Sequence, residues 1–316
     1  MTTQNTNTTG TVGTAGTAGT AGTLGTIVAA FGRHYEIVLD DDADGRRING
    51  IPRGKKSPYA CGDRVMLGPF HDSEAQILGH APRRSLLYRS DQWKQKLIAA
   101  NATQIVLVVA TEPGFSDELI SRTLVAAQHE QMRAVIVLNK ADLAMNLPAA
   151  RAQLAPFAAL DIPVVELCAL HDAQSLTPWL SDQVSVLVGQ SGMGKSTLTN
   201  VLIPNACAAT REISTALDSG KHTTTHARLY QLPGGGSLID SPGLQEFGLA
   251  HLTRGEIELG FAEFVPHLGH CRFRDCLHES EPGCAIKAAI AAGTIDARRL
   301  THFVTITREG DRAKSF

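Results

Sequence analysis

Residues 189–196 read GQSGMGKS, and this spacing of glycine, lysine and serine is suited to holding the phosphates of a nucleotide. The glycines allow backbone N–H groups to turn toward phosphate oxygens, and a helix that begins here adds positive potential at its N-terminus. Lys195 then neutralises the β- and γ-phosphates, Ser196 offers a hydroxyl ligand to Mg²⁺, and Thr197 lies near the α-phosphate. The residues expected to line the phosphates are Gly189, Gln190, Ser191, Gly192, Met193, Gly194, Lys195, Ser196 and Thr197.

A second phosphate motif, DSPG at 240–243, follows a short apolar run and lies 51 residues after Gly189. DSPG is also a good turn sequence, so its meaning depends on the phosphate loop upstream. Together with the phosphate loop, the motif places Asp240 where it can hold the hydration shell of Mg²⁺. It also places the backbone N–H of Gly243 where it can reach the γ-phosphate. A threonine between the two motifs is a further magnesium ligand, and the spacing does not choose among Thr223, Thr224 and Thr225.

The stretch VLNKADL at 137–143 contains a signature that selects guanine. An aspartate carboxylate accepts two parallel hydrogen bonds from guanine N1–H and N2–H₂, whereas adenine offers an acceptor at the first position and nothing at the second. Asp142 therefore selects guanine, Asn139 fits the other edge of the base, and the Lys140 stem covers the ring, with Ala141 completing the loop. GTP and GDP are the expected ligands, although this base loop precedes the phosphate loop in the chain.

Four potential metal ligands, Cys271, Cys276, His278 and Cys284, fall within 14 residues. Three thiolates and one neutral imidazole suit a tetrahedral structural Zn²⁺, and they leave no open position for catalysis. His267 and His270 are alternatives to His278, but the Cys-x-His-x5-Cys spacing favours His278. We therefore expect one structural zinc ion that stabilises a small domain.

These side chains need elements that bring distant loops together. Continuous apolar runs such as 105–110 and 184–189 are typical of parallel strands covered on both faces, and Ser116 is expected to cap a helix. The predicted fold is multidomain α/β: an OB-like barrel with short strands at 26–90, a doubly wound GTPase domain at 91–247, and a helical zinc-binding domain at 248–316. Residues 1–25, almost entirely Thr, Gly, Ala and Asn, are expected to be a disordered tail.

Composition limits the remaining possibilities. None of the apolar runs approaches the roughly 20 residues of a membrane-spanning helix, and the N-terminus lacks a secretory signal, so we expect a cytoplasmic protein without membrane contact. The net charge of −2 excludes a strong global attraction to nucleic acid, so RNA contact must depend on local patches. One such patch lies in the loops of the barrel and consists of Arg46, Arg47, Arg53, Lys55 and Lys56, with Tyr59 nearby as a stacking group for RNA. An ordinary solvated surface explains these residues equally well.

The base loop comes first in the chain, followed by the phosphate loop and DSPG, with a barrel before them and a zinc cluster after them. In this order of motifs, residues 24–316 resemble the RsgA (YjeQ) family of circularly permuted GTPases. The segments that carry the resemblance are WKQKLIAAN, VLNKADL, GQSGMGKSTLTN, GKHTTTHARLY, DSPGLQEFGL and CRFRDCLHESEPGCAIKAA. The resemblance implies GTP hydrolysis stimulated by the small (30S) ribosomal subunit and a role in late maturation of that subunit. It also implies contacts of the OB and zinc domains with ribosomal RNA, and we expect a monomer.

Two positions depart from common GTPase patterns. The residue after DSPG, where many GTPases carry a water-orienting glutamine, is Leu244, which cannot position water. The resemblance points instead to His222 as the residue that orients or deprotonates the attacking water, and a loop histidine without chemistry is the alternative. In the second base loop, usually Ser-Ala, the sequence has Cys168-Ala169, and we expect the Ala169 N–H to contact the base.

Two other function classes are consistent with part of the sequence. An ATPase or small-molecule kinase shares the phosphate loop but has no use for the guanine signature. An RNA-binding scaffold is favoured by the near-neutral charge of the C-terminal region, which offers no broad basic face. The intact set of Lys195, Ser196 and Asp240 argues more strongly for an enzyme. The permuted order also leads from Gly243 directly into 248–316, so we hypothesise that γ-phosphate contact at Gly243 biases the orientation of the zinc domain.

Overall fold

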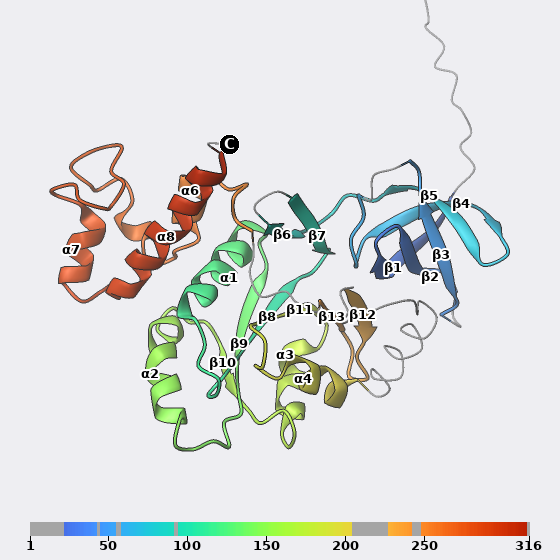
Figure 1. Ribbon diagram of the computed structural model, residues 1–316, viewed down its shortest axis with the longest axis horizontal. Coiled ribbons are helices and arrows are strands. Elements are labelled where there is room, and N and C mark those ends of the chain that lie inside the picture. Colours follow the sequence, from blue (N-terminus) through green and yellow to red (C-terminus); the bar gives the residue numbers. More distant parts are fainter. Residues whose placement is uncertain are drawn as a thin grey trace, which may run out of the picture.

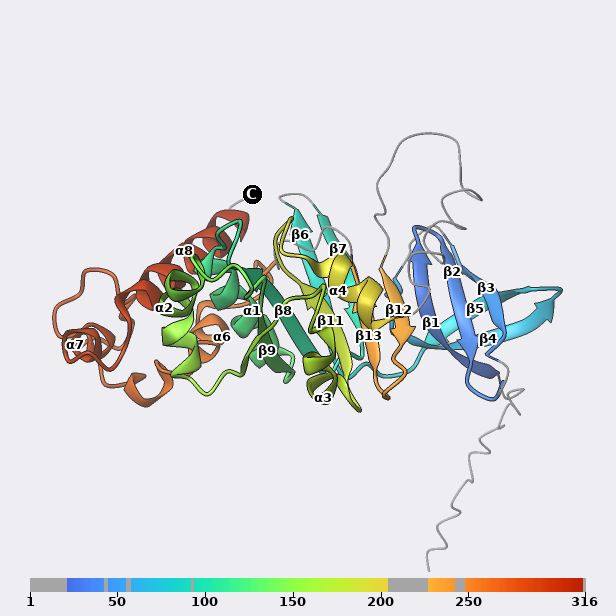
Figure 2. The ribbon, with the colours of Figure 1, turned by 90° about the horizontal axis from the view of Figure 1, so that it is seen from below.

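The computed structural model describes residues 22–42, 45–54, 58–91, 94–203, 227–241 and 248–314. It confirms the predicted fold class, a multidomain α/β protein with an N-terminal barrel, a central GTPase domain and a C-terminal helical region. The barrel and the C-terminal helices lie at opposite ends of the molecule, with the central sheet between them (Figures 1 and 2).

The N-terminal barrel is built from five strands in the order β1-β2-β3-β5-β4, and it closes through pairing of β1 with β4. Exposed and buried residues alternate along β3 (RINGIP), so every second residue of the strand faces the barrel interior. The strands are β1 (Thr23–Phe31), β2 (His34–Leu39), β3 (Arg47–Pro52), β4 (Arg64–His71) and β5 (Glu74–His80). The first strand thus begins inside the segment that composition assigns to the tail.

A two-stranded hairpin, β6 (Leu86–Asp91) and β7 (Lys94–Ala100), follows the barrel and spans the domain boundary expected near residue 90. An isolated bridge between Cys61 and Ala99 joins this hairpin to the barrel.

The central sheet has the strand order β10-β9-β8-β11-β13-β12. The first five of these strands are parallel, and β12 pairs antiparallel with β13. Every residue of β8 is buried, as expected for a strand covered on both faces. The strands are β8 (Gln104–Ala110), β9 (Arg133–Asn139), β10 (Val164–Glu166), β11 (Val184–Val188), β12 (Arg228–Gln231) and β13 (Ser237–Asp240). The register pairs Ala29 of β1 with Arg228 of β12, so the barrel continues the edge of this sheet.

Helices cover the central sheet on both faces (Figure 2). Among them α1 packs against β8 and β9, and α4 follows directly from β11. They are α1 (Asp117–His129), α2 (Leu147–Ala158), the 3-10 turn η1 (Ala173–Leu176), α3 (Thr177–Leu180) and α4 (Lys195–Leu202).

The C-terminal region packs α6 and α8 against each other and against α1. A cluster of three buried aromatic rings, Phe261, Phe264 and Phe303, forms its core. The elements are α6 (Arg254–Leu259), the 3-10 turn η2 (Val265–His267), α7 (Ala285–Ala291) and α8 (Ala297–Lys314). In the described part of the chain, no helix combines the length and apolar character needed to cross a membrane.

Candidate nucleotide-binding site and metal centre

The three predicted nucleotide motifs meet at one edge of the central sheet. The base loop follows β9, the phosphate loop follows β11, and Asp240 is the last residue of β13. Because these strands are parallel, their carboxyl ends lie at the same edge, whatever the order in which the chain visits them. The early position of the base loop in the sequence is therefore compatible with a single nucleotide site.

The phosphate loop depends on backbone conformations that favour glycine. Gly192 and Gly194 have φ angles of 81° and 91°, and Gly194 occupies the N-cap position of α4. A Cβ added to Gly189, where φ is 147°, would lie 2.2 Å from the carbonyl oxygen of Val108. The loop can therefore pass close to the neighbouring strand only because this position has no side chain.

Asn139 connects the base loop to the phosphate loop. Its side chain is buried, and its Nδ2 donates a hydrogen bond of 2.8 Å to the carbonyl oxygen of Met193. Its Oδ1 accepts from the backbone N–H of Lys140 at 2.8 Å and from that of Ala169 at 2.9 Å. This hydrogen bond joins the second base loop to Asn139, and the contact of the Ala169 N–H with the base stays a prediction.

The base loop itself is fixed by contacts around Lys140. This residue has a φ of 57°, and its Nζ donates to the carbonyl oxygen of Glu112 at 2.7 Å. The Thr111 hydroxyl donates to the Lys140 carbonyl at 2.8 Å. The Asp142 side chain is exposed at the rim of the loop, where it can reach a ligand.

Lys195 and Asp240 lie close enough to interact electrostatically. The Lys195 ammonium donates to the carbonyl oxygen of Gln190 at 2.8 Å, and burial lowers the pKa of Lys195 although Asp240 acts in the opposite direction. Burial raises the pKa of Asp240, while a 3.3 Å hydrogen bond from the Thr199 hydroxyl and the charge of Lys195 act against this. Burial disfavours the charged form of a carboxylate, and a nearby cation stabilises that form. Asp240 therefore fits a role near Mg²⁺. The contact of Thr199 with Asp240 had no signal in the sequence motifs.

Gln190 links the phosphate loop to α1. Its side-chain oxygen accepts a 3.1 Å hydrogen bond from the backbone N–H of Ser116. Ser116 is the N-cap residue of α1, as predicted, but its own side chain makes no capping hydrogen bond. The first turn of α1 is thus connected to the phosphate loop through Gln190.

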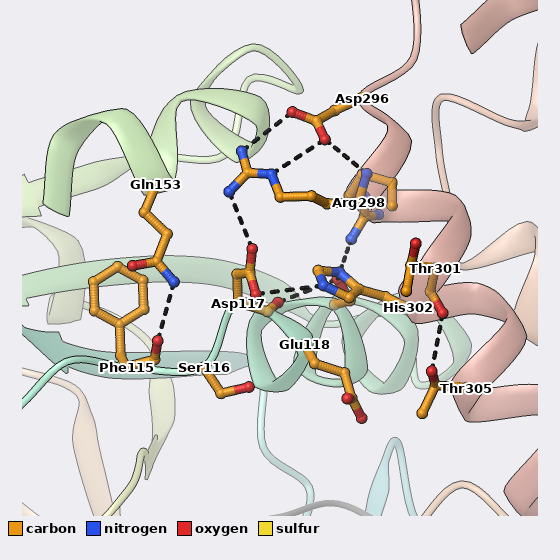
Figure 3. Close-up of polar contacts among 12 residues, drawn as sticks. Phe115, Ser116, Asp117, Glu118, Gln153, Asp296, Arg298, Thr301, His302 and Thr305 are labelled. Carbon is orange, nitrogen blue, oxygen red and sulfur yellow. Dashed lines mark hydrogen bonds and ion pairs between the residues drawn. The ribbon is translucent and has the colours of Figure 1, made fainter. Parts of the chain in front are cut away.

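That same turn of α1 contacts α8 through charged side chains (Figure 3). The Asp117 carboxylate lies 3.1 Å from Arg298 Nη1 and 3.4 Å from His302 Nε2. The other ring nitrogen of His302 lies 2.8 Å from the Ser121 hydroxyl. This partly buried polar network joins the C-terminal region to the GTPase domain.

Several predicted site residues fall outside the described residues. They are His222, the three candidate magnesium ligands Thr223, Thr224 and Thr225, the segment that contains Gly243 and Leu244, and Lys55 and Lys56 of the basic patch.

The predicted metal ligands form one compact cluster. The ligand atoms of Cys271, Cys276, His278 and Cys284 all lie within 4.8 Å of one another, and neither His267 nor His270 belongs to the group. The His278 Nδ1 lies 3.3 Å from Cys284 Sγ and 3.6 Å from Cys271 Sγ, and these two sulfurs are 4.0 Å apart. Tetrahedral zinc with ordinary bond lengths places such atoms about 3.6 to 3.8 Å apart, so the cluster fits this ion.

The backbone around the cluster adopts conformations that favour ligand convergence. His278 has a φ of 62°, an uncommon value for a residue other than glycine. The backbone N–H of Ala285 donates to Cys271 Sγ at 3.3 Å, as expected for a ligand thiolate. A carboxylate that the sequence analysis did not single out, Glu258, lies 3.4 Å from His278 Nε2.

Comparisons with known proteins agree with these features. A family model described as RsgA GTPase matches residues 80–250. The chain is 51% identical over 294 residues to the small ribosomal subunit biogenesis GTPase RsgA of Bordetella pertussis, covering 92% of this chain and 97% of the relative. It is 50% identical over 290 residues to the protein of the same name from Burkholderia pseudomallei, covering 90% and 92%.

Two solved structures share the fold. YjeQ from Thermotoga maritima superposes with a TM-score of 0.69 at 27% identity, covering 91% of this chain and 98% of that one. YloQ, described as a circularly permuted GTPase, superposes with a TM-score of 0.68 at 24% identity, covering 92% and 96%.

Proposed function

The chain belongs to the RsgA GTPase family and is a GTPase, and from this premise we propose that it hydrolyses GTP during late maturation of the small ribosomal subunit. The subunit stimulates the reaction, and the protein acts as a cytoplasmic monomer. Its relatives carry the name small ribosomal subunit biogenesis GTPase, which supports the biological role. The observation that carries the enzymatic assignment is the hydrogen bond between Asn139 and Met193, because it joins a guanine-selecting loop to a phosphate loop.

Each loop has a distinct task in this proposal. Residues 189–197 bind the phosphates, with Lys195 neutralising their charge, and residues 139–142 bind guanine, with Asp142 selecting it. Ser196 and Asp240 would hold Mg²⁺, which supplies positive charge at the β- and γ-phosphates. Gly243 would contact the γ-phosphate and transmit its presence to residues 248–316, so that GTP and GDP states differ in their affinity for the subunit. Equal subunit affinity with GDP and with a non-hydrolysable GTP analogue would refute that transmission.

His222 is proposed to orient or deprotonate the attacking water, because Leu244 cannot. Turnover that depends on the subunit follows if the segment around His222 is ordered by the subunit. His222→Ala should then abolish subunit-stimulated turnover and leave GTP affinity nearly intact. Stimulated turnover at the wild-type rate would exclude this role.

The barrel (residues 26–90) and the zinc domain (residues 248–316) are proposed to contact ribosomal RNA. In the zinc domain, Phe273 is exposed and the Arg272 guanidinium lies 5.5 Å from its ring centroid, which places a stacking group beside a positive charge. In the barrel, Arg46 and Arg47 are both exposed, but Arg47 is paired with Glu36, and Tyr59 packs edge-on against Tyr35. These contacts favour Arg46 over Arg47 and Tyr59 as an RNA ligand.

The proposal is tested by measuring GTP turnover with and without purified small subunits, with Ser196→Ala as the inactive control. Acceleration by the subunit, lost in Ser196→Ala, is the expected result. Turnover that the subunit leaves unchanged would favour an RNA-binding scaffold in which the nucleotide only stabilises the fold. Competition by ATP as strong as that by GTP would contradict the guanine assignment.

A further inference from the structure

The two ring nitrogens of His278 have different polar neighbours. Its Nδ1 faces the sulfurs of Cys284 and Cys271, at 3.3 and 3.6 Å. Its Nε2 faces away from them, toward Glu258 Oε1 at 3.4 Å. A neutral imidazole has one nitrogen that carries a hydrogen and one that carries a lone pair, so a group that accepts the hydrogen at Nε2 leaves the lone pair at Nδ1.

Glu258 is held in place by the helix to which it belongs. The α6 helix begins with a capping box, in which the Thr253 backbone N–H donates to Glu256 Oε2 at 2.7 Å and the Thr253 hydroxyl accepts from the Glu256 backbone N–H. One turn before Glu258, Arg254 donates to the carbonyl oxygen of Leu277, and its guanidinium lies 5.0 Å from the Phe303 ring centroid. The helix thus contacts two consecutive residues of the metal loop, Leu277 through Arg254 and His278 through Glu258.

The neighbouring Arg254 does not account for the position of Glu258. Arg254 Nε lies 3.9 Å from Glu258 Oε1, too far for a hydrogen bond, and is buried with no hydrogen-bond partner among the described residues. The imidazole of His278 is closer to the same carboxylate oxygen, and the His278 side chain is only 5% exposed. The 3.4 Å separation is slightly longer than an ordinary N–H···O hydrogen bond of about 2.7–3.2 Å.

We propose that Glu258 is a positioning residue of the metal centre, which accepts the Nε2 hydrogen of His278 and so presents Nδ1 to zinc. Metal-bound histidines commonly donate their second N–H to a carboxylate or carbonyl, which fixes the tautomer and the ring orientation and raises ligand basicity. The α6 helix also packs against α8 and against α1 of the GTPase domain. The Glu258 carboxylate therefore links the metal loop to a helix that contacts the GTPase domain. This inference depends on the zinc assignment of the proposed function.

The test compares the zinc affinity of the full chain in three variants. Glu258→Ala removes both the acceptor and the charge, whereas Glu258→Gln keeps an acceptor oxygen and removes only the charge. Glu256→Gln is the matched control, because it removes the same charge from the same helix and glutamine still fits a capping box. Affinity is measured by competition with a chromogenic chelator, and the geometry of the site by the visible absorption of the cobalt(II)-substituted protein.

We expect Glu258→Ala to weaken zinc binding by about 10- to 100-fold, Glu258→Gln to weaken it less, and Glu256→Gln to leave it unchanged. The cobalt absorption bands should shift in Glu258→Gln and remain as in the wild type in Glu256→Gln. If Glu258→Ala does not fold, the affinity and spectrum of Glu258→Gln decide the question. Wild-type affinity and an unshifted spectrum in the Glu258 variants would overturn the inference, as would an equal loss in Glu256→Gln.

Native mass spectrometry of the wild type separates this inference from the zinc assignment. A wild-type chain that carries no zinc would refute the assignment itself. A wild-type chain with one zinc ion and Glu258 variants of unchanged affinity would refute only the role of Glu258.

Discussion

The Asn139 side chain donates a 2.8 Å hydrogen bond to the backbone carbonyl of Met193 and thereby ties the guanine-selecting loop to the phosphate loop. An added Cβ at Gly194 would lie 2.2 Å from the same Asn139 Nδ2, so the phosphate loop approaches this amide as closely as a glycine permits. Asn139 also accepts from the N–H groups of Lys140 and Ala169. One buried amide therefore sets the relative positions of three loops, a role distinct from the contact with the base edge that its motif predicts.

Replacement of Asn139 by alanine should weaken nucleotide binding through the loss of this bridge. The change leaves the Met193 carbonyl and two backbone N–H groups without partners, and each buried unpaired group costs about 1–3 kcal/mol. We expect affinity for GDP to fall by about 10-fold or more, with a lower melting temperature, as measured by titration with a fluorescent nucleotide and by calorimetry. Asn146→Ala is the control, because the Asn146 side chain is exposed and lies 3.5 Å from Glu112 as its one hydrogen-bond partner in the described part of the chain. Wild-type affinity in the Asn139 variant would show that the bridge is dispensable.

Replacement of Asp142 by asparagine should change which base is bound. Asparagine offers one acceptor and one donor, whereas guanine presents two donors to this position. Xanthine presents one donor and one acceptor, so the variant should lose GTP affinity and gain xanthosine triphosphate affinity. Competition between the two nucleotides measures the exchange, and the Asn139 variant should show no such gain. A variant that binds both nucleotides as the wild type does would remove Asp142 from base selection.

Sequence reasoning located the parts of the site that are contiguous in the chain. The phosphate loop, the base loop and the cysteine cluster each depend on local spacing, and short strands separated by glycine-containing turns indicate the barrel. The contacts between these parts have no local pattern. Asn139 and Met193 are separated by 54 positions, and Gln190 and Ser116 by 74, so only the packing of strands and helices brings them together.

The same reason explains the misses in the fold and at the metal centre. The pairing of β1 with β12 follows from docking of the barrel against a sheet edge, which alternation within either strand does not encode. Glu258 lies in a helix upstream of the four ligands and has no motif spacing to them. Its proximity to His278 becomes visible only when α6 is placed beside the metal loop.

Replacement of Gly189 by alanine should distort the phosphate loop. A methyl group there meets the Val108 carbonyl oxygen at 2.2 Å, and its φ of 147° disfavours a side chain. We expect a loss of more than about 1 kcal/mol in the free energy of unfolding, together with reduced affinity for GTP. Gly255→Ala is the matched control, because an added Cβ at Gly255 meets nothing within 4 Å. Equal stability and GTP affinity in the two variants would contradict the strain at Gly189, and urea unfolding with nucleotide titration measures both quantities.

The buried histidine between α1 and α8 should make folding stability depend on pH. His302 is 7% exposed and faces Asp117, Ser121, Glu118, Arg298 and Arg299. Burial lowers the pKa of His302 more than Asp117 raises it, so the folded protein holds the imidazole neutral. As pH falls below about 6.5, the unfolded chain takes up a proton at this position before the folded chain does. The free energy of unfolding should therefore fall in that range and be unaffected by this group above it.

His302→Gln removes the titrating group while keeping a polar side chain. Because the change also disturbs the buried contact with Ser121, the free energy of unfolding of the variant should be lower than that of the wild type near neutral pH. Its loss of stability on acidification should be smaller, because one proton-binding site of the unfolded chain is gone. Urea unfolding is measured at about pH 7.5 and about pH 5.5, two values that bracket the ordinary histidine pKa of about 6.5. The difference between them gives the change of unfolding free energy with pH for the variant and for the wild type. His34→Gln, a change at an exposed histidine, is the control and should retain the wild-type slope. A His302 variant that loses as much stability on acidification as the His34 variant would show that the α1–α8 contact does not titrate.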